Sequence, residues 1–210
     1  MRPCPCGQAH TPRLVVLTGG PGGGKTAVLE LARRTLCEHV KVLPEAAGIV
    51  FGGGFPRGDS PAVRRAAQRA IFHVQCELEA ASRAGNPAVL LCDRGTVDGA
   101  AYWPGPDDIW ADLGTTLAAE QGRYAAVVHM RTPVVGYNHR NPLRTESPAE
   151  AGVIDERIAA AWTGHPRRYF VESTDDFLTK AQRAVELIGD EIPECCRGHL
   201  MAASAAAPAR

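Results

Sequence analysis

Apolar positions in this chain fall into short uninterrupted runs and into longer stretches where they recur every three or four residues. The short runs are typical of buried parallel strands, and the longer stretches of helices that cover a sheet. The runs predict strands at residues 13–18, 40–43, 88–92, 124–130 and 168–171. The stretches predict helices at about residues 24–38, 60–81, 107–121, 147–162 and 177–188. Because strands and helices alternate, we expect a parallel, doubly wound α/β sheet.

A glycine-rich segment follows the first strand directly. Gly19-Gly20-Pro21-Gly22-Gly23-Gly24-Lys25-Thr26 has the spacing G-x-x-x-x-G-K-[ST], and the helix continues from Ala27. Glycines let successive N–H groups approach phosphate oxygens, and the helix start favours an anion. Lys25 can reach the β- and γ-phosphates, and the Thr26 hydroxyl can ligate Mg²⁺. The alternative is an ordinary glycine-rich turn, but the strand–loop–helix context favours a nucleotide phosphate site over residues 19–27.

Charged residues stand at the carboxyl ends of two further predicted strands. Glu45 follows the second strand, and Asp93 and Arg94 follow the third. Ligands of open α/β sheets bind at this edge, so all three are candidate site residues. Asp93 can hold Mg²⁺ directly or through water, and Arg94 can hold a carboxylate, phosphate or hydroxyl of a substrate. Glu45 has a second interpretation, as a carboxylate that the dipole of a following helix favours.

Two later segments are candidates for the walls of a substrate pocket. Asp98 and Tyr102 lie shortly after the third strand, where they can line an acceptor pocket, although Tyr102 can equally be a core aromatic. A polar segment after the fourth strand carries Arg140 and Arg144. A mobile loop with two arginines can neutralise migrating charge and exclude water when it closes. The alternative is an exposed basic loop.

Composition and charge narrow the classes of partner. Lys plus Arg equals Asp plus Glu at 23 each, with no block of like charge, so we expect no nucleic-acid partner. No apolar run approaches the roughly 18–20 residues of a membrane span, and no signal-peptide core is present, which predicts a cytoplasmic protein. We expect one domain over residues 13–190, a flexible leader over 1–12 and a partly disordered tail over 191–210.

The cysteines do not form a recognisable metal motif. Seven are scattered along the chain without two C-x-x-C pairs, so we expect reduced thiols. Cys4, Cys6 and His10 in the leader lack a fourth ligand nearby, which favours a flexible leader over a metal site. Cys195, Cys196 and His199 would complete such a site only if the two ends of the chain meet.

The ordered set of motifs resembles the AAA_28 family of predicted P-loop ATPase and kinase domains. It comprises the glycine-rich loop, Pro44-Glu45-Ala46-Ala47, Cys92-Asp93-Arg94-Gly95, Asp98-Gly99-Ala100-Ala101-Tyr102, Arg144-Thr145-Glu146 and Ala161-Trp162-Thr163-Gly164-His165-Pro166. The resemblance covers residues 13–190 and extends to the nicotinamide riboside kinase domain and to deoxynucleoside and thymidylate kinases. It implies a three-layer α/β/α P-loop NTPase fold, a five-stranded parallel sheet of order 2-3-1-4-5, and a lid over residues 140–146.

The same resemblance implies roles for the charged residues. Glu45 or Asp93 would accept the proton of an attacking hydroxyl, and Arg94 would position the acceptor; the sequence does not decide between the two carboxylates. The leading interpretation is a phosphotransferase that moves the γ-phosphate of ATP, with Mg²⁺, to a hydroxyl of a small nucleoside-like acceptor. GTP is the alternative nucleotide, but the guanine-specific N-K-x-D segment is absent. Other interpretations are a slow NTPase, or a nucleotide-dependent switch that docks a lipid head group or a protein.

Overall fold

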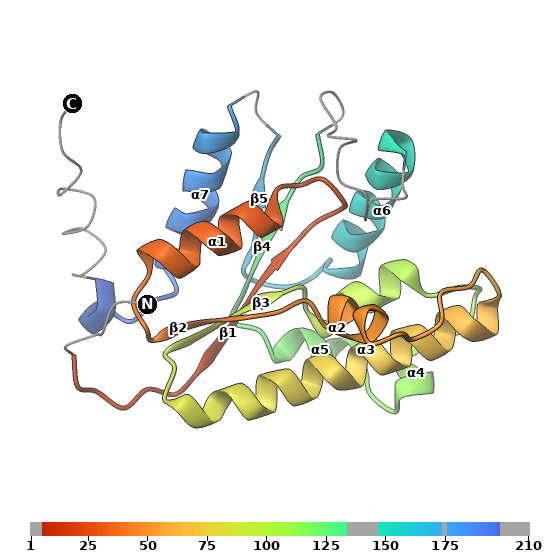
Figure 1. Ribbon diagram of the computed structural model, residues 1–210, viewed down its shortest axis with the longest axis horizontal. Coiled ribbons are helices and arrows are strands. Elements are labelled where there is room, and N and C mark those ends of the chain that lie inside the picture. The colour runs from red at the N-terminus through yellow and green to blue at the C-terminus, as the bar shows by residue number, and fades with distance from the viewer. Residues whose placement is uncertain (1–5, 134–146, 174–175, 198–210) are drawn as a thin grey trace.

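The computed structural model of the chain describes residues 6–133, 147–173 and 176–197, and its centre is one parallel sheet (Figure 1). The strands are β1 (Arg13–Thr18), β2 (Val40–Leu43), β3 (Val89–Asp93), β4 (Ala126–Met130) and β5 (Arg168–Val171). Their order is β2-β3-β1-β4-β5, and every pairing is parallel. The predicted order 2-3-1-4-5 is therefore confirmed.

Helices cover both faces of the sheet. One face carries α1 (Lys25–Thr35) and α7 (Phe177–Gly189), which lie above the sheet in Figure 1. The other face carries α3 (Pro61–Ser82), α4 (Ile109–Leu113), α5 (Leu117–Gly122) and α6 (Pro148–Ala161). The short α2 (Ala46–Gly52) follows β2, η1 (Arg83–Gly85) precedes β3, and η2 (Thr96–Tyr102) follows β3. This is the three-layer α/β/α arrangement of a P-loop NTPase.

Alternate residues of β1 supply the two halves of the core. Val15 and Leu17 are fully buried against the α1–α7 side, while Leu14 and Val16 pack on the opposite side with Trp162. Successive side chains of a strand point to opposite faces, so a strand buried on both faces must be apolar throughout. The uninterrupted apolar runs of the sequence are thus explained by a sheet covered on both sides.

One helix prediction was wrong. The stretch expected to form a single helix over residues 107–121 forms α4 and α5, which are separated at Gly114. Gly114 has φ 67° and caps α4 in the left-handed region, and the Thr116 hydroxyl accepts a hydrogen bond from the Ala119 N–H to start α5. A glycine C-cap followed by a threonine N-cap separated the two helices, although their apolar spacing is continuous.

A buried polar network fixes η2, which carries two of the candidate site residues. The Tyr124 hydroxyl donates to Glu79 Oε1 at 2.8 Å and accepts from the Thr96 N–H at 2.8 Å. The Thr96 hydroxyl donates to Glu120 Oε2 at 2.8 Å, and Arg123 pairs with Glu79. Buried polar groups satisfied in this way hold their elements in one arrangement. The start of η2 is therefore anchored to α3 and α5.

A membrane-spanning helix is not found among the described residues, since none of their helices is both long and apolar enough.

Candidate functional site

The loop between β1 and α1 packs too closely against other atoms to accept side chains at four of its glycines, two of which also have positive φ. Gly19 has φ 125°, and an added Cβ would overlap the main-chain oxygen of Met130 on β4. Gly24 has φ 94°, and an added Cβ would lie 2.6 Å from Cε2 of Phe177 on α7. Only glycine combines such φ values with such close packing. The loop is therefore held against both neighbouring elements, with the start of α1 directly behind it.

Lys25 points back over this loop. Its Nζ donates to the main-chain oxygens of Gly19 and Gly20, both at 2.8 Å. Burial lowers the pKa of Lys25 to about 7, with a further contribution from the nearby Arg94 guanidinium, while Asp93, Glu45 and Asp98 act in the opposite direction. The nearby carboxylates do not offset the effect of burial on this ammonium, and a bound phosphate would add negative charge beside it.

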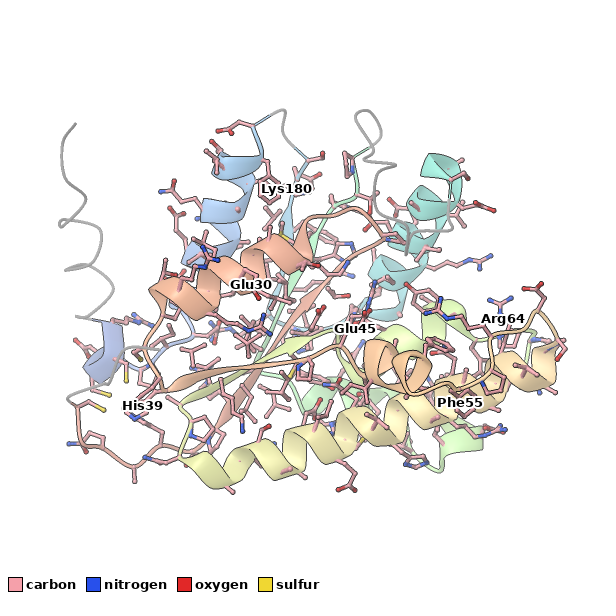
Figure 2. The ribbon with its side chains drawn as sticks, viewed as in Figure 1. Glu30, His39, Glu45, Phe55, Arg64 and Lys180 are labelled. Atoms are coloured by element: carbon pink, nitrogen blue, oxygen red, sulfur yellow. The ribbon has the colours of Figure 1, made fainter. Side chains whose placement is uncertain are left out.

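Glu45 and Asp93 are brought together by the strand order. The end of β3 lies between the ends of β2 and β1, with Leu43 beside Cys92 and Leu17 beside Asp93. Glu45, labelled in Figure 2, follows β2 as the N-cap residue of α2. Burial and the charge of Glu45 raise the pKa of Asp93 to about 6, against the opposing effects of Lys25 and Arg94. The two predicted carboxylates therefore face one site.

Arg94 joins Glu45 to the glycine-rich loop. Its Nε donates to Glu45 Oε1 at 2.8 Å, and its terminal nitrogen donates to the Gly19 oxygen at 3.2 Å. Arg94 adopts φ 70°, which is unusual for a residue with a side chain. Burial opposes its charge, but Tyr102, Glu45 and Asp98 together raise the pKa of Arg94, so the guanidinium stays charged.

Asp98 is buried, and its carboxylate is already occupied by groups of the chain. Its Oδ1 accepts from the Thr18 hydroxyl at 2.6 Å and from Trp162 Nε1 at 2.9 Å, and its Oδ2 accepts from the Gly95 N–H at 2.9 Å. These hydrogen bonds fix the turn after β3, which favours a role for Asp98 in positioning that turn. Tyr102 and Asp98 both border a cavity, and the Tyr102 ring centroid lies 5.8 Å from the guanidinium carbon of Arg94.

These residues surround a cavity of about 620 Å³, a size suited to a small ligand. Its polar lining joins the glycine-rich loop to the strand-end residues: Pro21, Gly22, Lys25, Thr26, Glu45, Asp93, Arg94, Asp98 and Tyr102. Its apolar lining comes from α2, α3 and α4: Phe51, Phe72, Ile71 and Ile109. A second cavity of about 770 Å³ shares Phe51, Arg57, Gln68 and Tyr102 with it and extends to α6. The space beside the phosphate loop is thus partly polar and partly apolar.

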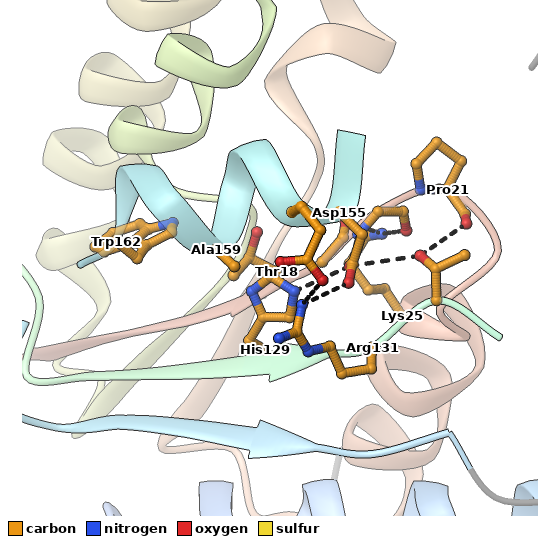
Figure 3. A network of polar contacts seen from close by, with 12 residues as sticks. Thr18, Pro21, Lys25, His129, Arg131, Asp155, Ala159 and Trp162 are labelled. Atoms are coloured by element: carbon orange, nitrogen blue, oxygen red, sulfur yellow. Dashed lines mark hydrogen bonds and ion pairs between the residues drawn. The ribbon is translucent and has the colours of Figure 1, made fainter. Parts of the chain in front are cut away.

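A second polar network on the other side of the loop was not predicted from the sequence (Figure 3). Asp155 of α6 accepts from the Gly20 N–H at 2.7 Å and pairs with His129 Nε2 at 2.9 Å and with Arg131 at 3.1 Å. The Thr132 hydroxyl donates to the Pro21 oxygen at 3.1 Å. Burial alone would raise the pKa of Asp155, but hydrogen bonds from His129, Gly20 and Arg131 hold it well below its ordinary range. Asp155 therefore anchors the glycine-rich loop to α6 through the Gly20 N–H.

The sequence did carry a signal for Asp155. It lies on the buried face of α6 with Ala151 and Ile158, where an isolated carboxylate is expected to have partners. Arg131 and Thr132 directly follow β4, at the same sheet edge as the other site residues. The two remaining predicted residues, Arg140 and Arg144, lie outside the described residues.

Comparison with known proteins places the chain among P-loop domains. The profile of the AAA_28 family, described as an AAA domain, matches residues 14–179. No curated protein sequence matches the chain. The solved structure of NadR protein in complex with NR has the same fold, with a TM-score of 0.62 and 14% sequence identity. The match covers 86% of this chain and 52% of the other, so this chain spans about half the length of that protein.

Proposed function

The chain belongs to the AAA_28 family of AAA domains, and on that premise we propose that it is a P-loop phosphotransferase. In this proposal it transfers the γ-phosphate of ATP to a hydroxyl of a small acceptor. The observation that carries the proposal is the 620 Å³ cavity, whose lining joins the phosphate loop to Glu45, Asp93, Arg94 and Tyr102. A protein that only hydrolyses nucleotide does not require a partly apolar space beside the γ-phosphate position. A phosphotransferase requires it, because the acceptor must replace water there.

The chain's own residues suit a magnesium nucleotide. The loop N–H groups and Lys25 would hold the phosphates, and a bound phosphate would restore the positive charge that burial disfavours on Lys25. The Thr26 hydroxyl and Asp93 would hold Mg²⁺, whose chemistry is to neutralise charge on the phosphate oxygens. Burial and the charge of Glu45 raise the pKa of Asp93 despite the nearby Lys25 and Arg94, and a bound cation would favour its charged form.

Glu45 is then the carboxylate that accepts the proton of the attacking hydroxyl. It borders the cavity with its side chain 37% exposed, and Arg94 fixes its orientation at 2.8 Å. In the proposed step the acceptor oxygen bonds to the γ-phosphorus, the bond to the β-phosphate oxygen breaks, and the hydroxyl proton passes to Glu45. ADP and a phosphorylated acceptor leave. Arg94 and Tyr102 would orient the acceptor, and positioning would supply most of the rate.

The test is the release of ADP and GDP by the purified protein with Mg²⁺, against a panel of nucleosides, sugars, aminoglycosides and inositol lipids. Lys25→Ala serves as the blank. We expect one acceptor to raise ADP release many-fold and to gain the mass of one phosphate. Tight nucleotide binding without stimulation by any acceptor would overturn the proposal in favour of a nucleotide-dependent switch.

A second experiment distinguishes the role of Asp93 from that of Glu45. Asp93→Asn should raise the Mg²⁺ concentration needed for half-maximal turnover, whereas Glu45→Gln should lower turnover at saturating Mg²⁺ without that change. Both variants should still bind nucleotide. The opposite pattern would exchange the two roles.

A further inference from the structure

The first and last described segments of the chain meet at the end of the sheet opposite the phosphate loop. Residues 6–12, which precede β1, lie beside a helical turn over residues 194–197 that follows α7 (Figure 1). The turn before β2 lies between them. Together these segments gather Cys6, His10, His39 and Cys196, whose ligand atoms all lie within 4.8 Å of one another. In Figure 2, His39 lies next to sulfur atoms at this end of the molecule.

The distances that involve the two cysteines of this cluster are close to those between the ligands of one tetrahedral metal ion. Cys6 Sγ lies 3.5 Å from His10 Nε2, 3.5 Å from His39 Nδ1 and 3.9 Å from Cys196 Sγ. Cys196 Sγ lies 3.2 Å from His39 Nδ1 and 3.8 Å from His10 Nε2. Zinc bonds of about 2.3 Å to sulfur and 2.0–2.1 Å to nitrogen place tetrahedral ligand atoms roughly 3.3–3.8 Å apart. All four atoms lie within 4.8 Å of one another, so a small rotation of the His10 or His39 ring would bring them around one ion.

Each ligand is held in place by the fold around it. The His39 oxygen accepts from the Ala88 N–H at 2.8 Å and from the Val89 N–H at 3.0 Å, which ties this turn to the start of β3. The His10 N–H donates to Asn86 Oδ1 at 2.9 Å. Cys196 is fully buried in the core between the sheet and α1 and α7, and Cys6 packs against the same core. The cluster is a built feature of the fold rather than a chance surface contact.

From these residues we propose that Cys6, His10, His39 and Cys196 bind one zinc ion that fastens both ends of the chain to the sheet. Two thiolates and two neutral imidazoles balance the charge of Zn²⁺, which suits a partly buried position. On binding, the two thiols release their protons to solvent. Four protein ligands leave no open coordination position, so the site is structural and separate from the phosphate loop.

The proposed ion stabilises the native state against unfolding. Its ligands span residues 6 to 196, so it closes a loop that includes the whole sheet. The ligands come together only in the native state, so the metal adds its binding free energy to folding. Removal of zinc should therefore lower the thermal stability of the entire domain.

Cys195 provides a matched control next to the site. Its side chain is exposed, and its Sγ lies 3.9 Å from His10 Nε2 and 3.8 Å from Cys196 Sγ. It lies outside the tetrahedral set. Cys76 on α3, a residue remote from the site in sequence and fold, provides a second control.

The experiment measures the zinc content of the full chain purified without chelator, together with the absorption spectrum after exchange of zinc for cobalt. We expect one zinc per chain, and a cobalt spectrum with thiolate charge-transfer bands and the strong visible bands of a tetrahedral centre. Cys6→Ser and Cys196→Ser should weaken zinc binding roughly tenfold or more. Cys195→Ser and Cys76→Ser should keep the metal. The chelator-treated chain should unfold at a lower temperature than the untreated chain.

Several outcomes would overturn the proposal. One is a wild-type chain without zinc whose cobalt complex shows no thiolate bands, a result that needs no variant to fold. Another is a zinc-free chain lighter by two hydrogen masses, which would identify a disulfide bond in place of the metal. A third is loss of zinc in Cys195→Ser with retention in Cys6→Ser, which would replace the stated ligand set.

Discussion

The Arg94 guanidinium holds the Glu45 carboxylate at 2.8 Å and also contacts the phosphate loop through the Gly19 oxygen. One side chain thus couples the proposed proton acceptor to the nucleotide site. This coupling requires a guanidinium group, because one nitrogen of Arg94 donates to Glu45 and another donates to the Gly19 oxygen.

Arg94→Lys tests this coupling. Lysine keeps the charge but cannot reach both acceptors with a planar fork, so Glu45 should lose its fixed orientation. We expect kcat/KM for the acceptor to fall by about tenfold to a hundredfold, the equivalent of a lost hydrogen bond to a charged group. ATP affinity should change by no more than a few-fold. Steady-state kinetics and nucleotide titration measure the two effects, and an equal loss of both would contradict the assigned role.

Asp93→Asn should make the protein more stable at neutral pH while weakening its use of Mg²⁺. The pKa of Asp93 is about 6 in the folded chain, above the value of about 3.9 expected when unfolded. The folded state therefore binds more protons between these values, and the free energy of unfolding falls as pH rises through that window. Asparagine carries no charge, so the variant should unfold at a higher temperature than wild type at pH 8. The advantage should vanish below about pH 4.

The unfolding temperatures of wild type and Asp93→Asn, measured at pH 8 and below about pH 4, check this prediction. Asp59→Asn, at an exposed position, controls for the substitution itself. A variant that is less stable than wild type at pH 8 would show that the Asp93 carboxylate contributes favourably to folding.

Asp155→Asn should destabilise the protein and disturb the phosphate loop. The carboxylate accepts from the Gly20 N–H and pairs with His129 and Arg131 in a buried setting. Loss of one partner from such a network costs about 2–4 kcal/mol. Since these contacts lower the pKa of Asp155, their stabilisation is present above the ordinary aspartate pKa and is lost as pH falls through the depressed folded pKa. The gap between wild type and variant should therefore narrow in acid.

Glu156→Gln is the matched control for Asp155→Asn. Glu156 is exposed and pairs with the same Arg131, so its loss should cost less than about 1 kcal/mol. Chemical denaturation of both variants at pH 7 separates the two roles. Equal destabilisation by the two variants would mean that the contact of Asp155 with the loop contributes no additional stability.

Gly19→Ala should abolish nucleotide binding. A Cβ at this position would overlap the Met130 oxygen, and φ 125° excludes most side chains, so the loop must move. We expect a loss of about 2–4 kcal/mol in stability together with the loss of the phosphate site. Gly122→Ala, at the end of α5 with open space around it, should fold and bind nucleotide normally. Full nucleotide binding by Gly19→Ala would contradict the close packing described here.

The sequence predicted the parts of the site that follow from local rules. The phosphate loop is a contiguous motif, and Glu45, Asp93 and Arg94 each follow a predicted strand, so the parallel sheet brings them to one edge. The contact of Arg94 with Glu45 depends on the left-handed backbone at Arg94, which no local pattern indicates. The prediction of Asp98 as a substrate contact stays a prediction: Asp98 borders the cavity, and its carboxylate accepts from three donors of the chain.

Features that join distant segments could not be predicted in the same way. Asp155 meets Gly20 across 135 positions, and Cys6 meets Cys196 across 190. Such contacts depend on how helices pack on the sheet, and periodicity specifies only which face of a helix is buried. The cysteine and histidine spacing at either end gave no metal motif, because each end supplies only part of the ligand set.

The fate of the γ-phosphate tests the proposed phosphotransferase most directly. The protein is incubated with Mg²⁺ and ATP labelled at the γ-phosphate, in the presence of the most effective acceptor, and the products are separated. We predict that the label appears in the phosphorylated acceptor, that Glu45→Gln slows this transfer, and that Lys25→Ala shows none. Label found only in inorganic phosphate, at a rate indifferent to the acceptor, would contradict the proposed function.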